Sequence, residues 1–243
     1  MISKNQIKLI RSLEMKKNRK LNGLFVAEGP KVVGDLLQAG YHAKMLFATR
    51  EYPHAELITA DELHRISFLQ HPQEVLAVFE IPLNTMSAPA EHQLCLALDG
   101  VQNPGNLGTI IRIADWFGIE HVICSSDCAD LYNPKVVQAA MGSLARVKVH
   151  YMDLPAFLRS LEPGTPIYGT LLDGDDLYET MLSTRGVIVM GNEGNGLSDE
   201  VRQLVTSRIK IPSFNTSGSS AESLNVGVAT AVVCSEFKRR SGS

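Results

Sequence analysis

The segment GNEGNGLSDE, residues 191–200, follows a short apolar run at residues 187–190. Its first six residues include three glycines, and Glu193 stands between two of them. Glycine inside a regular helix or strand costs roughly 0.5–1 kcal/mol relative to alanine, so this composition argues against a packed element. We expect a turn at the end of a buried strand, where main-chain groups approach a ligand closely because no Cβ intervenes. A purely structural tight turn is the alternative.

Apolar strands and helical stretches alternate on both sides of this turn. From residue 94 onward, strand patterns fall at 94–98, 120–124, 146–149, 167–170, 187–190 and 208–211. Continuous apolar strands separated by helices predict a parallel sheet that is covered on both faces. Ligands of such sheets bind beyond the carboxyl ends of the strands, and the glycine-rich turn occupies one of these ends.

The first 80 residues show a second alternation of the same kind. We expect helices at 3–15 and 30–39, strands at 24–27, 44–48, 56–58 and 74–79, and a capping box between Thr59 and Glu62. Residues 81–93, IPLNTMSAPAEHQ, contain two prolines and no periodicity, which is typical of a linker. The chain is therefore predicted to be an α/β protein with a small N-terminal domain at 1–80, a linker at 81–93 and a larger parallel-sheet α/β domain at 94–243.

The composition is that of a soluble globular protein, with 44% apolar and 20% charged residues. The longest mostly apolar stretch, residues 226–234, is shorter than the roughly 20 residues that cross a membrane. The basic N-terminus has no apolar signal region. The four cysteines show no metal-binding spacing. We expect a cytoplasmic protein with reduced core thiols, no metal and no membrane partner.

The formal net charge of −3 hides a basic segment at residues 1–20. Glu14 is its only acidic residue. The segment can neutralise nucleic-acid phosphates, or it can form a solvated amphipathic helix with Ile7, Ile10 and Leu13 facing inward. Both interpretations stay open. The basic residues are Lys4, Lys8, Arg11, Lys16, Lys17, Arg19 and Lys20.

The segment DGVQNPGNLGTIIRIADWFG, residues 99–118, predicts a helix that starts beyond the first strand of the larger domain. Asn106 is the predicted N-cap. At 100° per residue, Arg112 lies about 150° from the centre of the apolar arc and therefore points away from the core. Trp116 lies on the same polar side, where it would contact a protein partner or a base unless a wider apolar arc buries it. The apolar arc consists of Leu107, Ile110, Ile111, Ala114 and Phe117.

The last segment, residues 211–240, begins with a polar loop of small residues. Ser219 and Glu222 predict a capping box, followed by a helix with so little polar face that the sheet or a second subunit must cover it. Ser223 and Asn225 would lie at the first turn of this helix, where polar side chains can point back at a site.

These three segments together resemble the three motifs of the SpoU family of RNA ribose 2′-O-methyltransferases. The matching patterns are N-x-x-N-x-G-x-x-x-R at 103–112, G-N-E-G-x-G-L at 191–197 and I-P…E-S-L-N-V at 211–226. The segment at 133–147, NPKVVQAAMGSLARV, is also similar to the family's. The first domain, with KLNGLFVAEGPKVV at 20–33, resembles the small substrate-binding domain of members that modify ribosomal RNA.

The resemblance implies a catalytic domain in which the C-terminal segment forms a deep trefoil knot. It also implies a homodimer with sites near its interface and S-adenosyl-L-methionine bound in a bent form by the knot loops. The cofactor-binding residues would be Gly191, Ile211 and Leu224, which contribute backbone, with Thr170 close by. The essential polar residues would be Asn106, Arg112, Glu193, Ser223 and Asn225.

For the reaction, the resemblance implies methyl transfer to a ribose 2′-hydroxyl of structured RNA, and ribosomal RNA is favoured over transfer RNA. A guanidinium seldom loses its proton in proteins, so we interpret Arg112 as an electrostatic clamp on phosphate and developing alkoxide, with the proton leaving to phosphate or water. One feature departs from the family pattern, because Pro212 and Ser223 are separated by a longer interval than the third motif usually has.

Two other functions compete with this interpretation. The first is an RNA-binding protein of the same fold without catalytic activity, which the joint presence of the five polar residues disfavours. The second is a nicotinamide-dependent oxidoreductase, suggested by the succession of strand, glycine-rich turn and helix. That function lacks the G-x-G-x-x-G fingerprint and a convincing ribose-binding acid.

Overall fold

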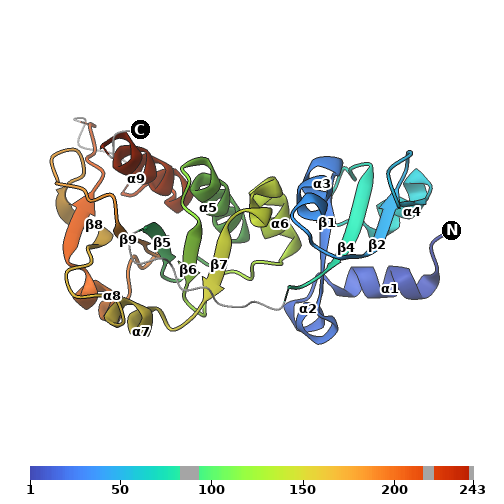
Figure 1. Ribbon diagram of the computed structural model, residues 1–243, viewed down its shortest axis with the longest axis horizontal. Helices are drawn as coiled ribbons and strands as arrows, with labels where there is room; N and C mark the ends of the chain where they lie inside the picture. The colour runs from blue at the N-terminus through green and yellow to red at the C-terminus, as the bar shows by residue number, and fades with distance from the viewer. Residues whose placement is uncertain (83–92, 216–221, 241–243) are drawn as a thin grey trace. The chain divides into compact units, whose positions relative to one another are not determined.

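The computed structural model describes residues 1–82, 93–215 and 222–240, which form two units (Figure 1). The first unit consists of residues 1–82 together with Asp130–Arg146. The second consists of residues 93–129, 147–215 and 222–240. Most of the predicted linker at 81–93 lies outside the described residues. In the described part of the chain, no helix is both long enough and apolar enough to cross a membrane.

The first unit is built on a small mixed sheet in the order β1-β4-β2-β3. β4 pairs antiparallel with both β1 and β2, and the short β3 pairs parallel with β2. Thr59 and Glu62 form the predicted capping box at the start of α4. The strands of this unit are β1 (Leu24–Glu28), β2 (Ala43–Ala48), β3 (Glu56–Leu57) and β4 (Val75–Glu80). Its N-terminal helices are α1 (Lys4–Ser12), α2 (Lys16–Asn22), α3 (Pro30–Gln38) and α4 (Ala60–Ile66).

The helix predicted at 3–15 is present as the shorter α1, and the sequence did not predict the second helix, α2, that follows it. Ile10 and Leu13 are fully buried in the core of the first unit and Ile7 packs against it, as the amphipathic interpretation predicts. Arg19 is also buried, so it cannot contribute to a basic surface as the sequence suggested. Its guanidinium donates to the carbonyls of Leu13 and Glu14 and forms an ion pair with Asp130.

The segment Asp130–Arg146 packs with the first unit, although the sequence groups it with the larger domain. It contains α6 (Pro134–Ala140) and the 3₁₀ turn η1 (Met141–Ala145). The ring of Tyr132 lies 4.6 Å from that of Phe25 in β1. A Cβ on Gly142 would lie only 1.6 Å from Asp35 Oδ2, which explains why the chain needs glycine there. Such contacts over long sequence separations have no local signature, so hydrophobic periodicity could not reveal them.

The second unit is built on a six-stranded parallel sheet in the order β10-β8-β9-β5-β6-β7, which confirms the predicted α/β class. Its strands lie within a few residues of the predicted positions, and β8 is several residues longer than predicted. The strands are β5 (Leu94–Leu98), β6 (His121–Cys124), β7 (Lys148–Tyr151), β8 (Ile167–Asp176), β9 (Gly186–Met190) and β10 (Ser207–Lys210). The helices are α5 (Pro104–Trp116), α7 (Leu154–Arg159), α8 (Asp199–Leu204) and α9 (Val226–Arg240).

Helices cover both faces of this sheet. α7 and α8 pack on one face, where Leu158 and Val201 join Cys95, Ala97 and other strand residues in one apolar cluster. α5 and α9 lie side by side and form the opposite layer (Figure 1). The central strands β5 and β9 are buried along their whole length, as expected for strands covered on both sides. All four cysteines are buried free thiols.

Candidate active site

The glycine-rich segment forms a tight turn immediately after β9. The main chains of Asn192 and Gly196 exchange two hydrogen bonds of 2.9 Å, and Gly196 has a φ of +69°. A Cβ on Gly191 would lie 2.4 Å from the carbonyl carbon of Gly196. The close approach that requires glycine at 191 is therefore, in the first place, an approach of the turn to itself. This geometry leaves the side chain of Glu193 at the tip of the turn.

Three polar side chains from distant segments meet at this turn. The Nδ2 group of Asn106 donates to Glu193 Oε1 at 2.5 Å. Asn106 Oδ1 accepts from Asn225 Nδ2 at 3.1 Å. The chain thus brings together one residue from each of the three segments singled out in the sequence. We call Asn106, Glu193 and Asn225 the polar triad.

The position of Asn106 in α5 corrects one expectation. Asn103, not Asn106, is the N-cap, and its Oδ1 accepts from the main-chain N–H groups of Gly105 and Asn106. Pro104 takes the first helical position, which suits its fixed φ and missing N–H group. Because Asn103 satisfies these N–H groups, the side chain of Asn106 is free to reach Glu193 and Asn225.

Asn225 has a second role at the start of α9. Its Oδ1 accepts from the N–H groups of Gly227 at 3.0 Å and Val228 at 3.3 Å, which is the bonding pattern of an N-cap. The helix begins at Val226, later than the predicted capping box between Ser219 and Glu222 requires. Ser219 lies outside the described residues, while Glu222 and Ser223 precede the helix.

A cavity of about 760 Å³ opens beside the glycine-rich turn. All four residues expected to bind a cofactor line it: Thr170, Gly191, Ile211 and Leu224. Glu193 and Ser223 line it as well, and the rest of its wall combines apolar residues such as Leu177 and Val233 with charged ones such as Asp173 and Lys210. Small-molecule sites typically have about 300–1,000 Å³, apolar walls and a few polar groups. The cavity therefore has the size and chemistry for a nucleoside-bearing ligand such as S-adenosylmethionine.

Thr170 and Ser223 lie at this cavity in different settings. Thr170 is partly buried on β8, and its hydroxyl donates to the carbonyl of Val189 in the neighbouring strand. Ser223 is exposed, next to the polar triad along the chain. The interval between Pro212 and Ser223 is described only at its two ends, at 212–215 and 222–223.

Arg112 stands apart from the polar triad. It is exposed on α5 and forms no ion pair or hydrogen bond with any residue in the described part of the chain. Thr109, one turn earlier on the same face, contacts α9. A Cβ added to Gly227 of α9 would lie 3.2 Å from the Thr109 side chain. Trp116 follows one turn later with 84% of its surface exposed, so it is not a core residue. Arg112 and Trp116 therefore share one solvent-facing stripe of α5.

Two residues at the same sheet edge were not singled out in the sequence. Asp99, only 8% exposed, accepts from the N–H of Ser198 at 2.7 Å. Asn192 donates from Nδ2 to the carbonyl of Gly100 at 2.7 Å. Asp99 directly follows the last residue of β5, and Asn192 is the second residue after the end of β9. This position beyond the carboxyl end of a buried parallel strand is the one signal that could have identified them.

Comparison with known proteins places the chain among RNA-modifying enzymes. Residues 93–235 match the SpoU rRNA Methylase family, and residues 4–77 match the MRM3-like substrate binding domain. A relative from Bacillus subtilis, 23S rRNA (guanosine(2553)-2′-O)-methyltransferase RlmP, is 28% identical over 243 residues, covering 95% of each chain.

Two solved structures are similar over nearly the whole chain. A putative RNA methyltransferase of the TrmH family from Porphyromonas gingivalis is 44% identical with a TM-score of 0.86, covering 99% of each chain. An AdoMet-bound rRNA methyltransferase from Sinorhizobium meliloti is 30% identical with a TM-score of 0.87, covering 100% of this chain and 98% of the other. With the family match spanning more than half of its residues, the chain belongs to the SpoU rRNA methylase family.

Proposed function

We propose that this chain is an S-adenosylmethionine-dependent methyltransferase that modifies a ribose 2′-hydroxyl of structured ribosomal RNA. The observation that carries the proposal is the polar triad, in which Asn106 and Asn225 are hydrogen-bonded in a chain to Glu193, a residue that lines the cavity. The family match and the 2′-O-methyltransferase relative support the reaction class and favour ribosomal RNA as the substrate. A catalytically inactive RNA-binding protein has no need of this arrangement.

The cavity residues would hold the cofactor chiefly through main chain. Gly191, Ile211 and Leu224 line the cavity and would contribute backbone groups, and Thr170 also lines it with a partly buried side chain. S-adenosylmethionine, when bound, supplies an electrophilic methyl group on a sulfonium centre. Apolar lining residues such as Leu177 would contact the apolar parts of the bound cofactor.

The polar residues would orient the ribose and stabilise the negative charge that develops on its 2′-oxygen. In-line positioning of the hydroxyl supplies much of the acceleration, because the geometry is fixed before reaction. Glu193, held by Asn106, fixes the polar rim, and Ser223 and Asn225 orient the sugar. Arg112 has no other partner among the described residues, which leaves its guanidinium free to bind a phosphate and stabilise the developing alkoxide. The proton leaves to that phosphate or to water.

We further propose that two copies of the chain associate through the outer layer of the second unit. Trp116 of α5 is 84% exposed and Val228 of α9 is 53% exposed, which is costly for large apolar side chains in water. Since Arg112 lies on the same stripe as Trp116, a partner that covers this face would bring an arginine to the interface. The functional enzyme is then a homodimer.

The remaining features implied by the family belong to the same proposal. They are the trefoil knot of the C-terminal segment, an RNA substrate-binding domain at 1–80, a linker at 81–93 and a methyltransferase domain at 94–243, in a cytoplasmic enzyme that needs no metal.

The test combines purified protein, methyl-labelled S-adenosylmethionine and total RNA, followed by nuclease digestion and separation of nucleosides. We expect label on ribose 2′-oxygens of ribosomal RNA. Label on base atoms would refute the reaction type. Tight RNA binding without S-adenosylmethionine binding in calorimetry would favour the inactive RNA-binding protein instead. Ribose-methylation mapping of RNA from cells that lack this protein would then identify the nucleotide.

A further inference from the structure

The helices α1 and α2 present a set of exposed lysines that the reaction itself does not use. All five are exposed, and none forms an ion pair with any residue in the described ranges. Because Arg11 donates to the carbonyl of Ser67 and lies over the ring of Phe68, and Arg19 is buried, neither belongs to the set. We call this set the lysine face: Lys4, Lys8, Lys16, Lys17 and Lys20.

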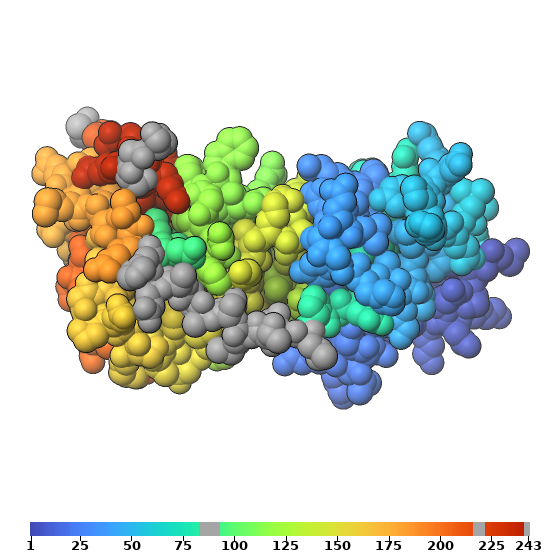
Figure 2. All heavy atoms as spheres, in the orientation of Figure 1, coloured from blue at the N-terminus to red at the C-terminus, as the bar shows by residue number. Residues whose placement is uncertain are grey.

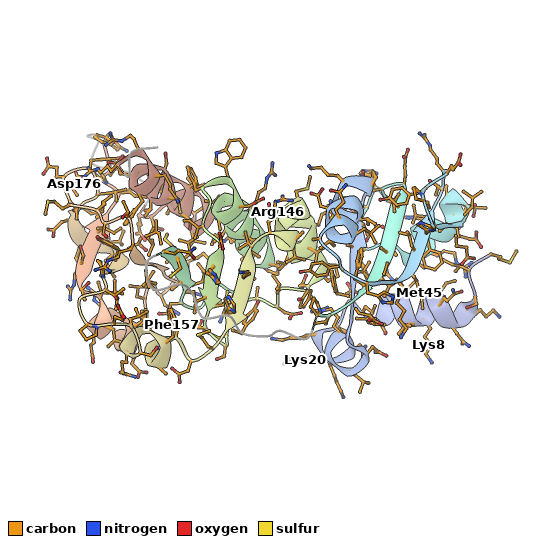
Figure 3. The ribbon with its side chains drawn as sticks, viewed as in Figure 1. Lys8, Lys20, Met45, Arg146, Phe157 and Asp176 are labelled. Carbon is orange, nitrogen blue, oxygen red and sulfur yellow. The ribbon has the colours of Figure 1, made fainter. Side chains whose placement is uncertain are left out.

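The lysines gather on one side of each helix. At 100° per residue, Lys4 and Lys8 lie about 40° apart on α1, and Lys16, Lys17 and Lys20 span about 100° on α2. Ile10 and Leu13 point the other way, into the core. Figure 3 shows Lys8 and Lys20 extending along the same lower edge of the first unit, and Figure 2 shows α1 and α2 forming the surface there.

We propose that the lysine face binds the phosphate backbone of the substrate RNA. Residues 1–20 contain seven basic residues and one acidic residue in a chain of formal net charge −3, so the rest of the chain is acidic overall. This uneven charge distribution would turn the basic segment of the first unit toward a polyanion. Unpaired lysines that contact phosphates release counterions and so give salt-dependent, sequence-independent affinity. The inference rests on the proposed function and specifies which surface of the first unit meets the RNA.

The test compares two double variants that change the net charge equally. Lys16→Glu with Lys20→Glu alters the lysine face, whereas Lys44→Glu with Lys148→Glu alters exposed lysines on β2 and β7. Fluorescence anisotropy would measure the affinity for a labelled ribosomal RNA fragment between 50 and 200 mM salt. Losing two phosphate contacts should weaken binding about tenfold and lower the slope of log K against log salt by about 1.5. The control variant should match the wild type.

Equal affinity and equal slope in both variants would overturn the lysine face. So would lysine-dependent binding to anionic lipid vesicles in the absence of RNA binding. Calorimetry of S-adenosylmethionine and thermal unfolding verify that both variants are folded. Lysine-dependent RNA binding by a wild-type protein that transfers no methyl group would contradict the proposed function while leaving the lysine face intact.

A separate set of contacts concerns Asn192, which joins two of the three loops that carry the polar triad, those of Glu193 and Asn106. Its Oδ1 accepts from the N–H groups of Gly194 at 2.9 Å and Asn195 at 3.1 Å, which shapes the turn around Glu193. Its Nδ2 donates to the carbonyl of Gly100 at 2.7 Å, at the start of the loop that leads to Asn106. A single amide thus contacts both loops.

Other bonds hold the same junction. The N–H of Asp99 donates to the carbonyl of Met190, and its carboxylate accepts from Ser198, so the two loops are also joined at their bases. The N–H of Gly100 donates to Ser125 Oγ at 2.9 Å. These bonds hold the carbonyl of Gly100 in place. The hydrogen bond from Asn192 to this carbonyl therefore fixes the turn relative to the loop that leads to Asn106.

The geometry points to Asn192 as a positioning residue that sets Glu193 against Asn106. An amide suits both loops, because its oxygen accepts from two N–H groups while its nitrogen, a separate atom, donates to one carbonyl. An aspartate at 192 would keep the acceptors and place a second oxygen against the Gly100 carbonyl. This inference also rests on the proposed methyl transfer.

The variant Asn192→Asp separates this role from simple turn formation. We expect kcat to fall about tenfold or more, since a partly buried hydrogen bond is replaced by a repulsive contact, while the KM for S-adenosylmethionine changes less. Relative to wild type, activity should recover as the pH is lowered, because a protonated carboxyl can donate to Gly100. Asn133→Asp is the matched control, since Asn133 Oδ1 accepts from the N–H of Lys135 and an aspartate keeps that acceptor.

If Asn192→Asp proves too unstable to measure, Asn192→Ser offers a shorter side chain, whose hydroxyl can accept from the turn N–H groups but does not reach the Gly100 carbonyl, and it adds no charge. It should show the same loss of kcat with no recovery at low pH. Wild-type kcat in both variants across the pH range would overturn the role of Asn192. Absence of methyl transfer in the wild-type enzyme would instead contradict the proposed function, which the labelling experiment measures first.

Discussion

Asn106 donates to Glu193 at 2.5 Å across a separation of 87 residues, and the same side chain accepts from Asn225. The two bonds use the two ends of one amide, so they fix its orientation. Glu193 needs a donor and the N–H of Asn225 needs an acceptor, and the amide of Asn106 offers the two on separate atoms. The polar triad is therefore chemically specific at its central residue.

The variant Asn106→Asp tests this specificity. Two facing carboxylates repel each other, so we expect the polar rim to open and kcat to fall roughly 10- to 100-fold. Initial rates of methyl transfer with saturating S-adenosylmethionine would measure the change. The control is Asn103→Asp, which introduces a carboxylate at the same helix end but keeps the cap acceptor. Equal losses in both variants would contradict the assignment.

The turn after β9 should not tolerate a side chain at Gly191. In Gly191→Ala the new methyl group would lie 2.4 Å from the main chain of Gly196, which must move. We expect a loss of about 1–3 kcal/mol in the free energy of unfolding and weaker S-adenosylmethionine binding. Gly194→Ala is the comparison, because its nearest atom would be Asn192 Oδ1 at 3.5 Å. Urea unfolding and calorimetry should show a clearly smaller effect for that variant.

Removing the guanidinium of Arg112 should affect the reaction and leave the fold intact. Since Arg112 is exposed and unpaired among the described residues, we expect Arg112→Ala to keep the wild-type melting temperature. Its kcat should fall about 100- to 1,000-fold, as for other groups that stabilise developing charge. Arg185→Ala, at another exposed arginine, is the control. Unchanged turnover in Arg112→Ala would remove Arg112 from the site.

Stability should depend on Glu236 in an acidic pH range. Hydrogen bonds from Arg239 and Arg240 hold the pKa of Glu236 at about 2, well below its ordinary value of 4.5. A lowered pKa in the folded state means that the stabilisation is complete above pH 4.5 and is lost as the pH falls toward 2. We expect Glu236→Gln to be less stable than wild type at pH 7, and the difference in urea midpoint to vanish near pH 2. A constant difference would exclude the linkage.

Arg19 should be essential for the stability of the first unit. It is 2% exposed, and its charge is compensated by Asp130 and by the carbonyls of Leu13 and Glu14. Removing Asp130 would leave a buried unpaired charge, so we expect Asp130→Ala to cost about 3–5 kcal/mol. The double variant Arg19→Met with Asp130→Ala should recover part of this loss. Thermal unfolding of the three proteins provides the measurement.

The sequence predicted the elements of the second unit well, because its buried strands are continuous apolar runs. Two further predictions are confirmed: the exposed position of Arg112 on α5, and the capping box of Thr59 and Glu62. The N-cap of α5 was wrong because two asparagines compete there, and only the structure shows that Asn103 takes the cap. α2 was missed since its run of lysines has no apolar period.

Residue types alone could not reveal which polar groups meet. Asn192 and Asp99 are ordinary loop residues in the sequence, and their bonds to Gly100 and Ser198 depend on strands that are adjacent only in the sheet. Arg19 appeared to be one more surface cation, and its burial follows from Asp130, 111 residues away. Long-range pairing decided each of these cases.

The polar triad draws on three segments, and its last member follows Asn106 by 119 positions. During synthesis, a nascent chain that has not yet passed residue 225 holds Asn106 and Glu193 but cannot complete the network. α9 would add both Asn225 and the layer beside α5 only after it leaves the ribosome. The hydrogen-bonded network of Asn106, Glu193 and Asn225 can therefore form only in a chain that has been synthesised beyond residue 225.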